Sequence, residues 1–246
     1  MASIPLMYAQ EDCELGGKDG IENDFAYRNN VSNADKEIRL GFIRKVYGLL
    51  SIQLLVTLGV STVFLLVRPV QFFVQQNPWL MMVAFMLSMV TLLALFAKRK
   101  ETPANLYLLA AFTVVQAYSI GVVVSMSDTV VVLKALAITF TVVLSLTLYT
   151  LRTKTDFSFV SYAMMAGLCV LIVGGVLQIF VRSSALELAL SFAGVILFSL
   201  FLIYDTQMMM TTLSPEEYIL ATINLYLDII NLFLYILRIL SEMNRN

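Results

Sequence analysis

Seven apolar runs, each long enough to cross a lipid bilayer, constrain this chain more than any other feature. A helix needs about 20 residues to span the hydrocarbon core of a membrane. The runs cover about residues 46–67, 78–97, 104–127, 129–151, 157–181, 186–210 and 215–240. Hydrophobic residues make up 59% of the 246 and charged residues 13%, a balance that water-soluble domains do not keep. The sequence therefore predicts an all-α integral membrane protein, with a bundle of seven transmembrane helices over residues 41–243.

The segment before the first run is acidic. Residues 1–24 hold six acidic residues and one basic residue, Lys18, and they offer little apolar surface to bury. This composition predicts a disordered tail over residues 1–40. The net charge of -1 lacks the basic excess that nucleic-acid binding requires, so we expect the lipid bilayer, and no nucleic acid, as a partner.

Basic residues are unevenly distributed between the two ends of the runs. Nine lie within ten residues before the first run and in the second and fourth connections, and five lie on the opposite side. By the positive-inside rule, this places the N-terminus in the cytosol. Seven crossings would put the C-terminus on the far side, whereas six crossings and a re-entrant last segment would keep both ends in the cytosol. The sequence leaves these two topologies open.

Histidine is absent, and only two cysteines, Cys13 and Cys169, are present. This excludes histidine-dependent nucleophile pairs, histidine-ligated metals and a disulfide framework. We therefore expect no enzyme activity and no cofactor.

Two aspartates, Asp205 and Asp228, are the ionisable residues predicted at membrane depth, apart from the shallower Lys134, whose side chain can reach the interface. The segment LSPEEY predicts that the last helix begins with Ser214 as N-cap, Pro215 as its first residue and a capping box. Counted from that turn, Asp228 lies about 20 Å deep and Asp205 about 12 Å deep. For the carboxylates to meet, this offset of about 8 Å would have to be removed by helix tilt, by a broken helix or by a different end of the sixth span.

A polar stripe follows one face of the predicted last helix, at steps of three and four residues. It consists of Glu217, Ala221, Asn224, Asp228, Asn231, Tyr235, Arg238 and Glu242. Such a stripe either joins helices by hydrogen bonds or lines a pathway, with Asn224, Asn231 and Tyr235 as candidate lining residues.

Two carboxylates in hydrocarbon need compensation, because each ionised aspartate costs about 2.5–3.5 kcal/mol near the centre of a membrane. They can share a proton, or they can face a hydrated cavity and attract a cation. Oxygen ligands suit Ca²⁺, and so small a ligand set predicts transient binding by Asp205 and Asp228, which conduction requires. The alternative is that the pair is structural.

Four segments resemble the transmembrane Bax-inhibitor-motif family, and in particular its lifeguard and Golgi anti-apoptotic branch. They are FIRKVYGLLSIQLLVT, YTLRTKTDFS, IYDT and SPEEYILATINLYLDIINLFLYIL, at residues 42–57, 149–158, 203–206 and 214–237. The resemblance covers about residues 35–243 and implies a Ca²⁺ leak channel of the Golgi or the endoplasmic reticulum that lowers stored Ca²⁺ and inhibits apoptosis. Apoptotic regulators and Ca²⁺ release channels are the partners that it implies.

The resemblance also assigns site residues. Asp205 and Asp228 correspond to the family's proton-sensitive pair, and Glu216 or Glu217 to an acidic residue at the mouth of the pore. Bacterial relatives lock the pair with an arginine in the second helix, but residues 79–97 contain none here. The counter-ion of the pair therefore stays open.

Two other functions use the same residues. In a cation or proton antiporter, the aspartates would carry the coupled ion, although no internal repeat is evident. In a non-conducting scaffold that binds apoptotic regulators, they would only join helices, and their asparagine variants would keep full activity.

Overall fold

The structure is a computed structural model that describes residues 31, 36–153 and 161–245. Within these residues it contains eight α-helices and no strand, so the predicted all-α class is confirmed. They are α3 (Lys36–Leu66), α4 (Arg68–Gln76), α5 (Trp79–Ala97), α6 (Ala104–Ser125), α7 (Thr129–Arg152), α8 (Ser161–Val181), α9 (Ser184–Thr211) and α10 (Tyr218–Arg245). All except α4 are long and apolar enough to cross a membrane, which confirms seven spans. Most of the predicted acidic tail lies outside the described residues.

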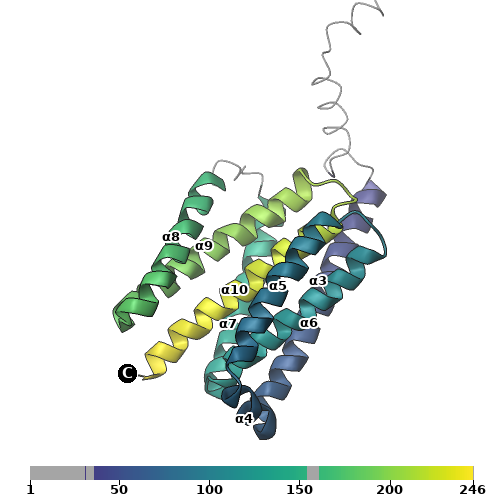
Figure 1. Ribbon diagram of the computed structural model, residues 1–246. Helices are drawn as coiled ribbons and strands as arrows, with labels where there is room; N and C mark the ends of the chain where they lie inside the picture. The colour runs from purple at the N-terminus through teal and green to yellow at the C-terminus, as the bar shows by residue number, and fades with distance from the viewer. Residues whose placement is uncertain (1–30, 32–35, 154–160, 246) are drawn as a thin grey trace, which may run out of the picture.

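The helix α10 occupies the centre of the bundle and packs against α3, α6, α7 and α9 (Figure 1). In its most apolar stretch 67% of the residues are buried, compared with 11% in α8. It is one continuous helix, and its last residues lie at the opposite end of the bundle from the first residues of α3 (Figure 1). This arrangement is that of seven crossings.

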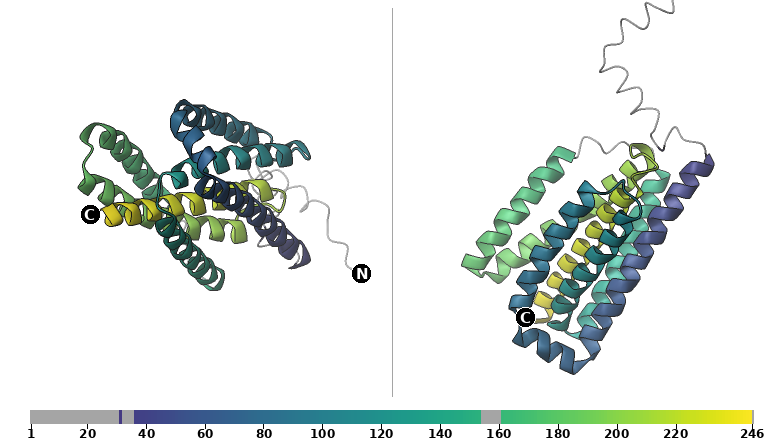
Figure 2. Two further views of the ribbon diagram at one scale, coloured as in Figure 1. Left: turned by 90° about the horizontal axis from the view of Figure 1, so that it is seen from below. Right: turned by 45° about the vertical axis from the view of Figure 1, so that its right-hand side comes forward.

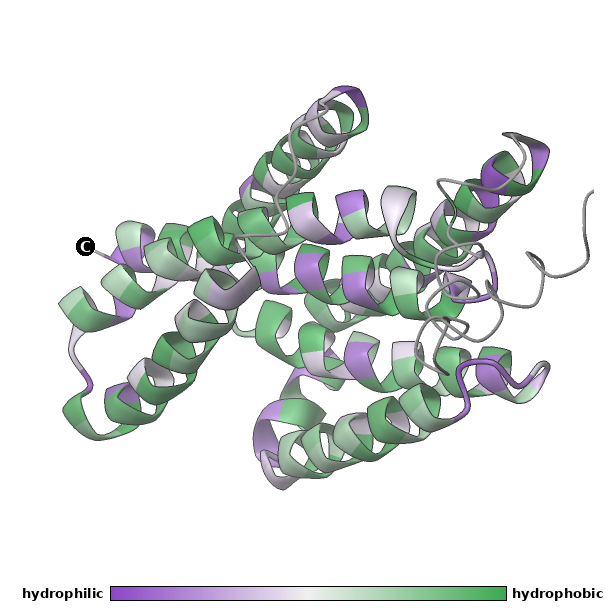
Figure 3. Cartoon of the chain, turned by 90° about the horizontal axis from the view of Figure 1, so that it is seen from above, coloured by the Kyte–Doolittle hydropathy of each residue, from purple (hydrophilic) through white to green (hydrophobic). Residues whose placement is uncertain are grey.

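The helices α5 and α8 form the periphery, since α5 packs mainly on α6 and α8 mainly on α9 (Figure 2). Both present large apolar side chains outward, for example Met82 and Phe180. Apolar colour covers the outer faces, whereas polar residues gather at helix ends and between helices (Figure 3). A surface of this kind is stable only against lipid.

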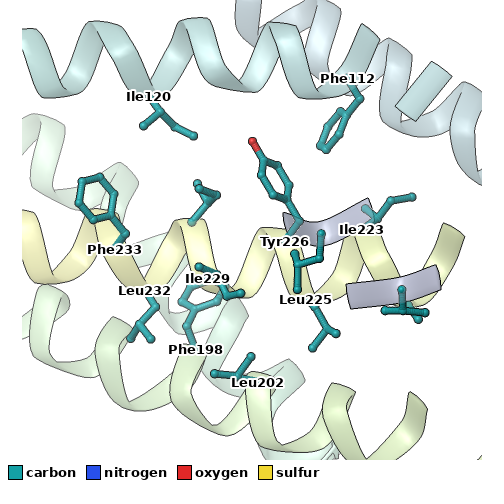
Figure 4. Close-up of a cluster of buried hydrophobic side chains, with 14 of the residues drawn as sticks. Phe112, Ile120, Phe198, Leu202, Ile223, Leu225, Tyr226, Ile229, Leu232 and Phe233 are labelled. Atoms are coloured by element: carbon teal, nitrogen blue, oxygen red, sulfur yellow. The ribbon is translucent and has the colours of Figure 1, made fainter. Parts of the chain in front are cut away.

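The core joins α10 to α6 on one side and to α9 on the other (Figure 4). The fully buried Tyr226 meets Phe112 edge-on, with ring centroids 6.2 Å apart. Its hydroxyl lies 2.8 Å from Thr57 Oγ1 on α3. One turn earlier on α3, Gln53 Nε2 donates to Thr113 Oγ1 on α6 at 2.8 Å. Buried polar groups thus fix the register of α3, α6 and α10.

Two helix starts and one additional helix are the main differences from the prediction. The helix α3 begins at Lys36, ten residues before the apolar run, because helix-forming residues such as Lys, Glu, Arg and Leu extend it beyond the membrane. The helix α4 was not predicted, and it has Pro69 in its first turn.

The predicted first residue of the last helix, Pro215, is also wrong, because α10 begins at Tyr218. Residues 214–217 form a turn closed by the Glu217 amide, which donates to the Ser214 carbonyl at 2.9 Å. Half of the capping box is present, since Ser214 N donates to Glu217 Oε2 at 3.4 Å. The turn takes the place of the first helical turn that the box would otherwise cap.

Candidate functional site

The structure brings Asp205 of α9 and Asp228 of α10 together. Their side chains form a hydrogen-bonded contact, and they are only 9% and 5% exposed. Asp205 lies six residues before the end of α9, and Asp228 lies ten residues after the start of α10, or about 9 Å and about 15 Å along the helices. The ends of α9 and α10 are therefore displaced by about 6 Å, which the connection over residues 212–217 readily spans.

No basic side chain neutralises this pair within the part of the chain that the structure describes. The ion pairs there join Lys98 to Glu101, Arg99 to Glu217 and Arg238 to Glu187. The additional polar group beside Asp205 is the side-chain amide of Asn224, one turn before Asp228. Two carboxylates and one amide in an apolar bundle can share a proton or hold a partly hydrated cation.

The ligand set fits a passing ion better than a stored one. Among the described residues there is no group of three or more His, Cys, Asp or Glu side chains that could hold a metal ion. The Oδ2 atom of Asp228 is buried, and no group among the described residues donates a hydrogen bond to it. Because Ca²⁺ prefers six to eight oxygens, these residues would have to be supplemented by water.

The other residues of the polar stripe are engaged in different ways. Asn231 donates to the Leu227 carbonyl of its own helix at 2.8 Å, so it lies near the aspartate pair without facing it. Glu217 forms an ion pair with Arg99 at 3.4 Å. Glu216 is exposed at the same end of the bundle, where its amide donates to Ser214 Oγ at 3.5 Å.

Tyr235 fills the interface between α9 and α10 beyond the aspartate pair. Its ring stacks on Phe198, with centroids 5.7 Å apart and planes at 25°. The ring also covers Gly194, where a Cβ atom would lie 2.6 Å from Tyr235 ring carbons. Tyr235 is therefore a packed wall residue in this conformation, not a residue that faces open space.

The far end of the same interface is closed by a charge pair. Arg238 Nε lies 3.7 Å from Glu187 Oε1, and the guanidinium lies over the Tyr235 ring, 5.7 Å from its centroid. The sequence placed Arg238 in the polar stripe but did not predict its pairing with Glu187. The signal was present in α9, because Glu187, Gly194, Phe198 and Asp205 are spaced by seven, four and seven residues, which puts them on one helical face.

We call this set of contacts the α9–α10 seam. It runs from Asp205–Asp228 through Phe198–Tyr235 to Glu187–Arg238. Beyond its first end, Arg99 of the α5–α6 connection pairs with Glu217, which precedes α10.

Comparison with known proteins gives a consistent result. Residues 39–246 match the family described as "Inhibitor of apoptosis-promoting Bax1". The chain is 42% identical to the "Golgi anti-apoptotic protein" of Vaccinia virus (strain Lister) over 231 residues, which are 94% of this chain and 98% of the viral protein. It is also 42% identical to "Protein lifeguard 4" of Mus musculus, over 93% of this chain and 96% of the mouse protein. "Bax inhibitor 1" of Schizosaccharomyces pombe is 32% identical, over 100% of this chain and 92% of the yeast protein.

Proposed function

Because the chain belongs to the family of inhibitors of apoptosis-promoting Bax1, we propose that it restrains apoptosis as a Ca²⁺ leak channel of an intracellular membrane, gated by Asp205 and Asp228. The relatives' names supply the anti-apoptotic part of this proposal, and the word Golgi in one of them supports a Golgi membrane. The proposed orientation, with the N-terminus in the cytosol, follows from the distribution of basic residues.

One observation carries the channel part of the proposal: two carboxylates touch inside the membrane-spanning bundle without a basic partner among the described residues. A buried charge without compensation is unfavourable by several kcal/mol. A purely structural contact would be made more cheaply by asparagine or serine, which need no proton to be buried. The cost is therefore better explained by a function that uses the charge.

The gating mechanism follows from the protonation of the pair. With one shared proton, Asp205 and Asp228 hold α9 against α10 and present one negative charge to a cation instead of two. When both carboxylates are ionised, they repel each other and together attract a hard cation such as Ca²⁺. The side-chain carbonyl of Asn224 would supply a third oxygen ligand, and water molecules would supply the remaining ligands of the ion. The leak should therefore increase as the pH rises.

The test is Ca²⁺ flux from proteoliposomes that contain the purified full-length chain, between about pH 5 and about pH 8. Asp205→Asn and Asp228→Asn should abolish or flatten the pH dependence, because an asparagine cannot lose the proton. The matched control is Glu101→Gln, which neutralises an exposed carboxylate paired with Lys98 outside the seam and should leave the flux unchanged. If the wild-type chain carries no Ca²⁺ at any pH, or if both asparagine variants behave like it, the channel proposal is wrong.

A non-conducting scaffold is the second candidate, and the closed remainder of the seam favours it. Phe198, Tyr235, Glu187 and Arg238 pack and pair as helix-joining residues do. In that case the two asparagine variants would lower the stability of the bundle but would leave protection from apoptosis in cells intact.

A further inference from the structure

A cavity of about 240 Å³ lies on the side of α10 that faces away from Asp205. Its walls come from α3, α6, α7 and α10. Its rim includes Leu58 and Phe140, which are 44% and 69% exposed and so face the lipid. Its floor includes Ile120 of α6 and Phe233 of α10, which project into the space between these helices (Figure 4).

The cavity has the depth of one membrane leaflet. On α7 it extends from Val132 to Val143, eleven residues or about 16 Å along the helix. This is about half of the roughly 30 Å hydrocarbon thickness of a bilayer. The outer end of the cavity lies near the end of α3 and the start of α7, at the end of the bundle that carries α4 (Figure 1).

The chemistry of the walls selects an apolar occupant. Apolar cavities of about 150 Å³ stay dry and bind small apolar molecules, and this one is larger. All four lining helices are candidate membrane spans. The cavity therefore opens onto lipid, and the apolar groups that lipid supplies are acyl chains.

One polar atom makes the site more specific. Ser61 lines the cavity near its outer end, is only 8% exposed, and its Oγ atom has no hydrogen-bond partner among the described residues. The neighbouring hydroxyls are satisfied, since Thr57 Oγ1 donates to the Gln53 carbonyl at 2.8 Å and Thr139 Oγ1 donates to the Ala135 carbonyl at 2.7 Å. A buried hydroxyl without a partner is unfavourable, so a ligand that brings an acceptor to Ser61 is favoured.

We propose that this cavity is a binding site for one acyl chain of a membrane glycerolipid, and that the Ser61 side chain rotates about χ1 so that its Oγ donates a hydrogen bond to the ester carbonyl. The ester group of such a lipid lies near the membrane interface, as does Ser61, five residues before the end of α3. The chain then extends past Ile120 toward the centre of the membrane and lies against Ile229 and Ile230, the two residues that follow Asp228. This site goes beyond the proposed leak and does not depend on it.

The test is photolabelling of the full-length chain in phosphatidylcholine liposomes, with a phosphatidylcholine that carries a photoactivatable diazirine on one acyl chain. Ile230 and Phe233 are buried, at 7% and 6% exposure, so lipid outside the bundle does not reach them. Label on these residues, identified by mass spectrometry of peptides, therefore reports a chain inside the cavity.

Four variants sharpen the result, three of them at the outer end of the cavity. Ser61→Leu fills the space and should reduce labelling of Ile230 and Phe233 several-fold, whereas Ser61→Ala keeps the space and should reduce it less. Thr62→Leu makes a similar change at the next residue, which is exposed to lipid. In this variant, Ile230 and Phe233 should be labelled as strongly as in the wild type. Leu136→Phe blocks the cavity from α7 and replaces Ser61→Leu if that variant does not fold.

Two results would overturn the proposal. The first is label confined to lipid-facing residues outside the cavity, such as Phe180, or equal α10 labelling in both blocking variants and the wild type. The second comes from a parallel reaction with a diazirine fatty acid: labelling of Ile230 and Phe233 by the free acid alone would exclude a glycerolipid.

Discussion

Replacing Gly194 with alanine should loosen the α9–α10 seam, because the glycine leaves room for an aromatic ring. A Cβ atom at this position would lie 2.6 Å from Cδ1 and Cγ of Tyr235 and 2.7 Å from Cδ2. Cβ atoms essentially never approach other heavy atoms this closely, and the contact is with the rigid part of the ring. Tyr235 must therefore move away from α9, and its stacking on Phe198 is lost or weakened.

The expected cost follows from these two contributions. Overpacking of a dense interior costs about 1–3 kcal/mol, and an aromatic pair contributes about 0.5–1.5 kcal/mol beyond the area it buries. We expect Gly194→Ala to lower the free energy of unfolding by about 2–4 kcal/mol. Since about 1 kcal/mol corresponds to about 2–4 °C in a chain of this size, the thermal midpoint in detergent should fall by several degrees.

A double-variant cycle separates this clash from a general effect of alanine. Tyr235→Leu removes the ring, so Gly194→Ala should cost little in that background, with a coupling energy of about 1–3 kcal/mol. Gly175→Ala is the matched control, because nothing lies within 4 Å of the added Cβ there, and it should be neutral or slightly stabilising. Additive effects of Gly194→Ala and Tyr235→Leu would refute the reasoning, since they would mean that the ring and the glycine do not share one space.

Two smaller perturbations test other contacts. Tyr226→Phe removes the hydroxyl that lies 2.8 Å from Thr57 Oγ1 and should lower the free energy of unfolding by about 1 kcal/mol; a loss above about 3 kcal/mol in chemical or thermal unfolding would point to a larger polar network. Arg238→Gln removes a partly exposed ion pair to Glu187, so it should lower the free energy of unfolding by less than about 1 kcal/mol. This decrease, measured by thermal unfolding, should be smaller still at high salt. A large, salt-independent loss would show that the Arg238 side chain matters through its packing on Tyr235 instead.

The sequence was sufficient to predict the spans and to single out the two aspartates that the structure brings together. Apolar runs report membrane crossings directly, because the bilayer fixes their length. Asp205 and Asp228 could be identified since charges are rare inside such runs. Their contact was less certain in the sequence, because counting from the turn gave an offset of about 8 Å. The displacement of the two helix ends removes this objection.

The rest of the seam could not be predicted for a physical reason. The helix α9 is apolar almost all round, so its composition does not show which face meets α10 and which meets lipid. Gly194 and Phe198 therefore looked like any other apolar positions. The helix α4 was not predicted because its nine residues, RPVQFFVQQ, are too few for a membrane span. One proline and three glutamines in so short a segment also do not give a clear helical pattern. Ser61 became notable only when packing left its hydroxyl without a partner.

The central place of α10 also has a consequence for how the protein is made. The ribosome synthesises the other seven described helices before α10, which then contacts α3, α6, α7 and α9. Until that moment, Asp205 has no carboxylate beside it, and Thr57 of α3 lacks its contact with the Tyr226 hydroxyl. A nascent chain halted before residue 218 thus leaves these polar groups of the membrane-spanning helices without their partners. The aspartate pair is therefore completed only when α10, the last of the described helices, packs into the bundle.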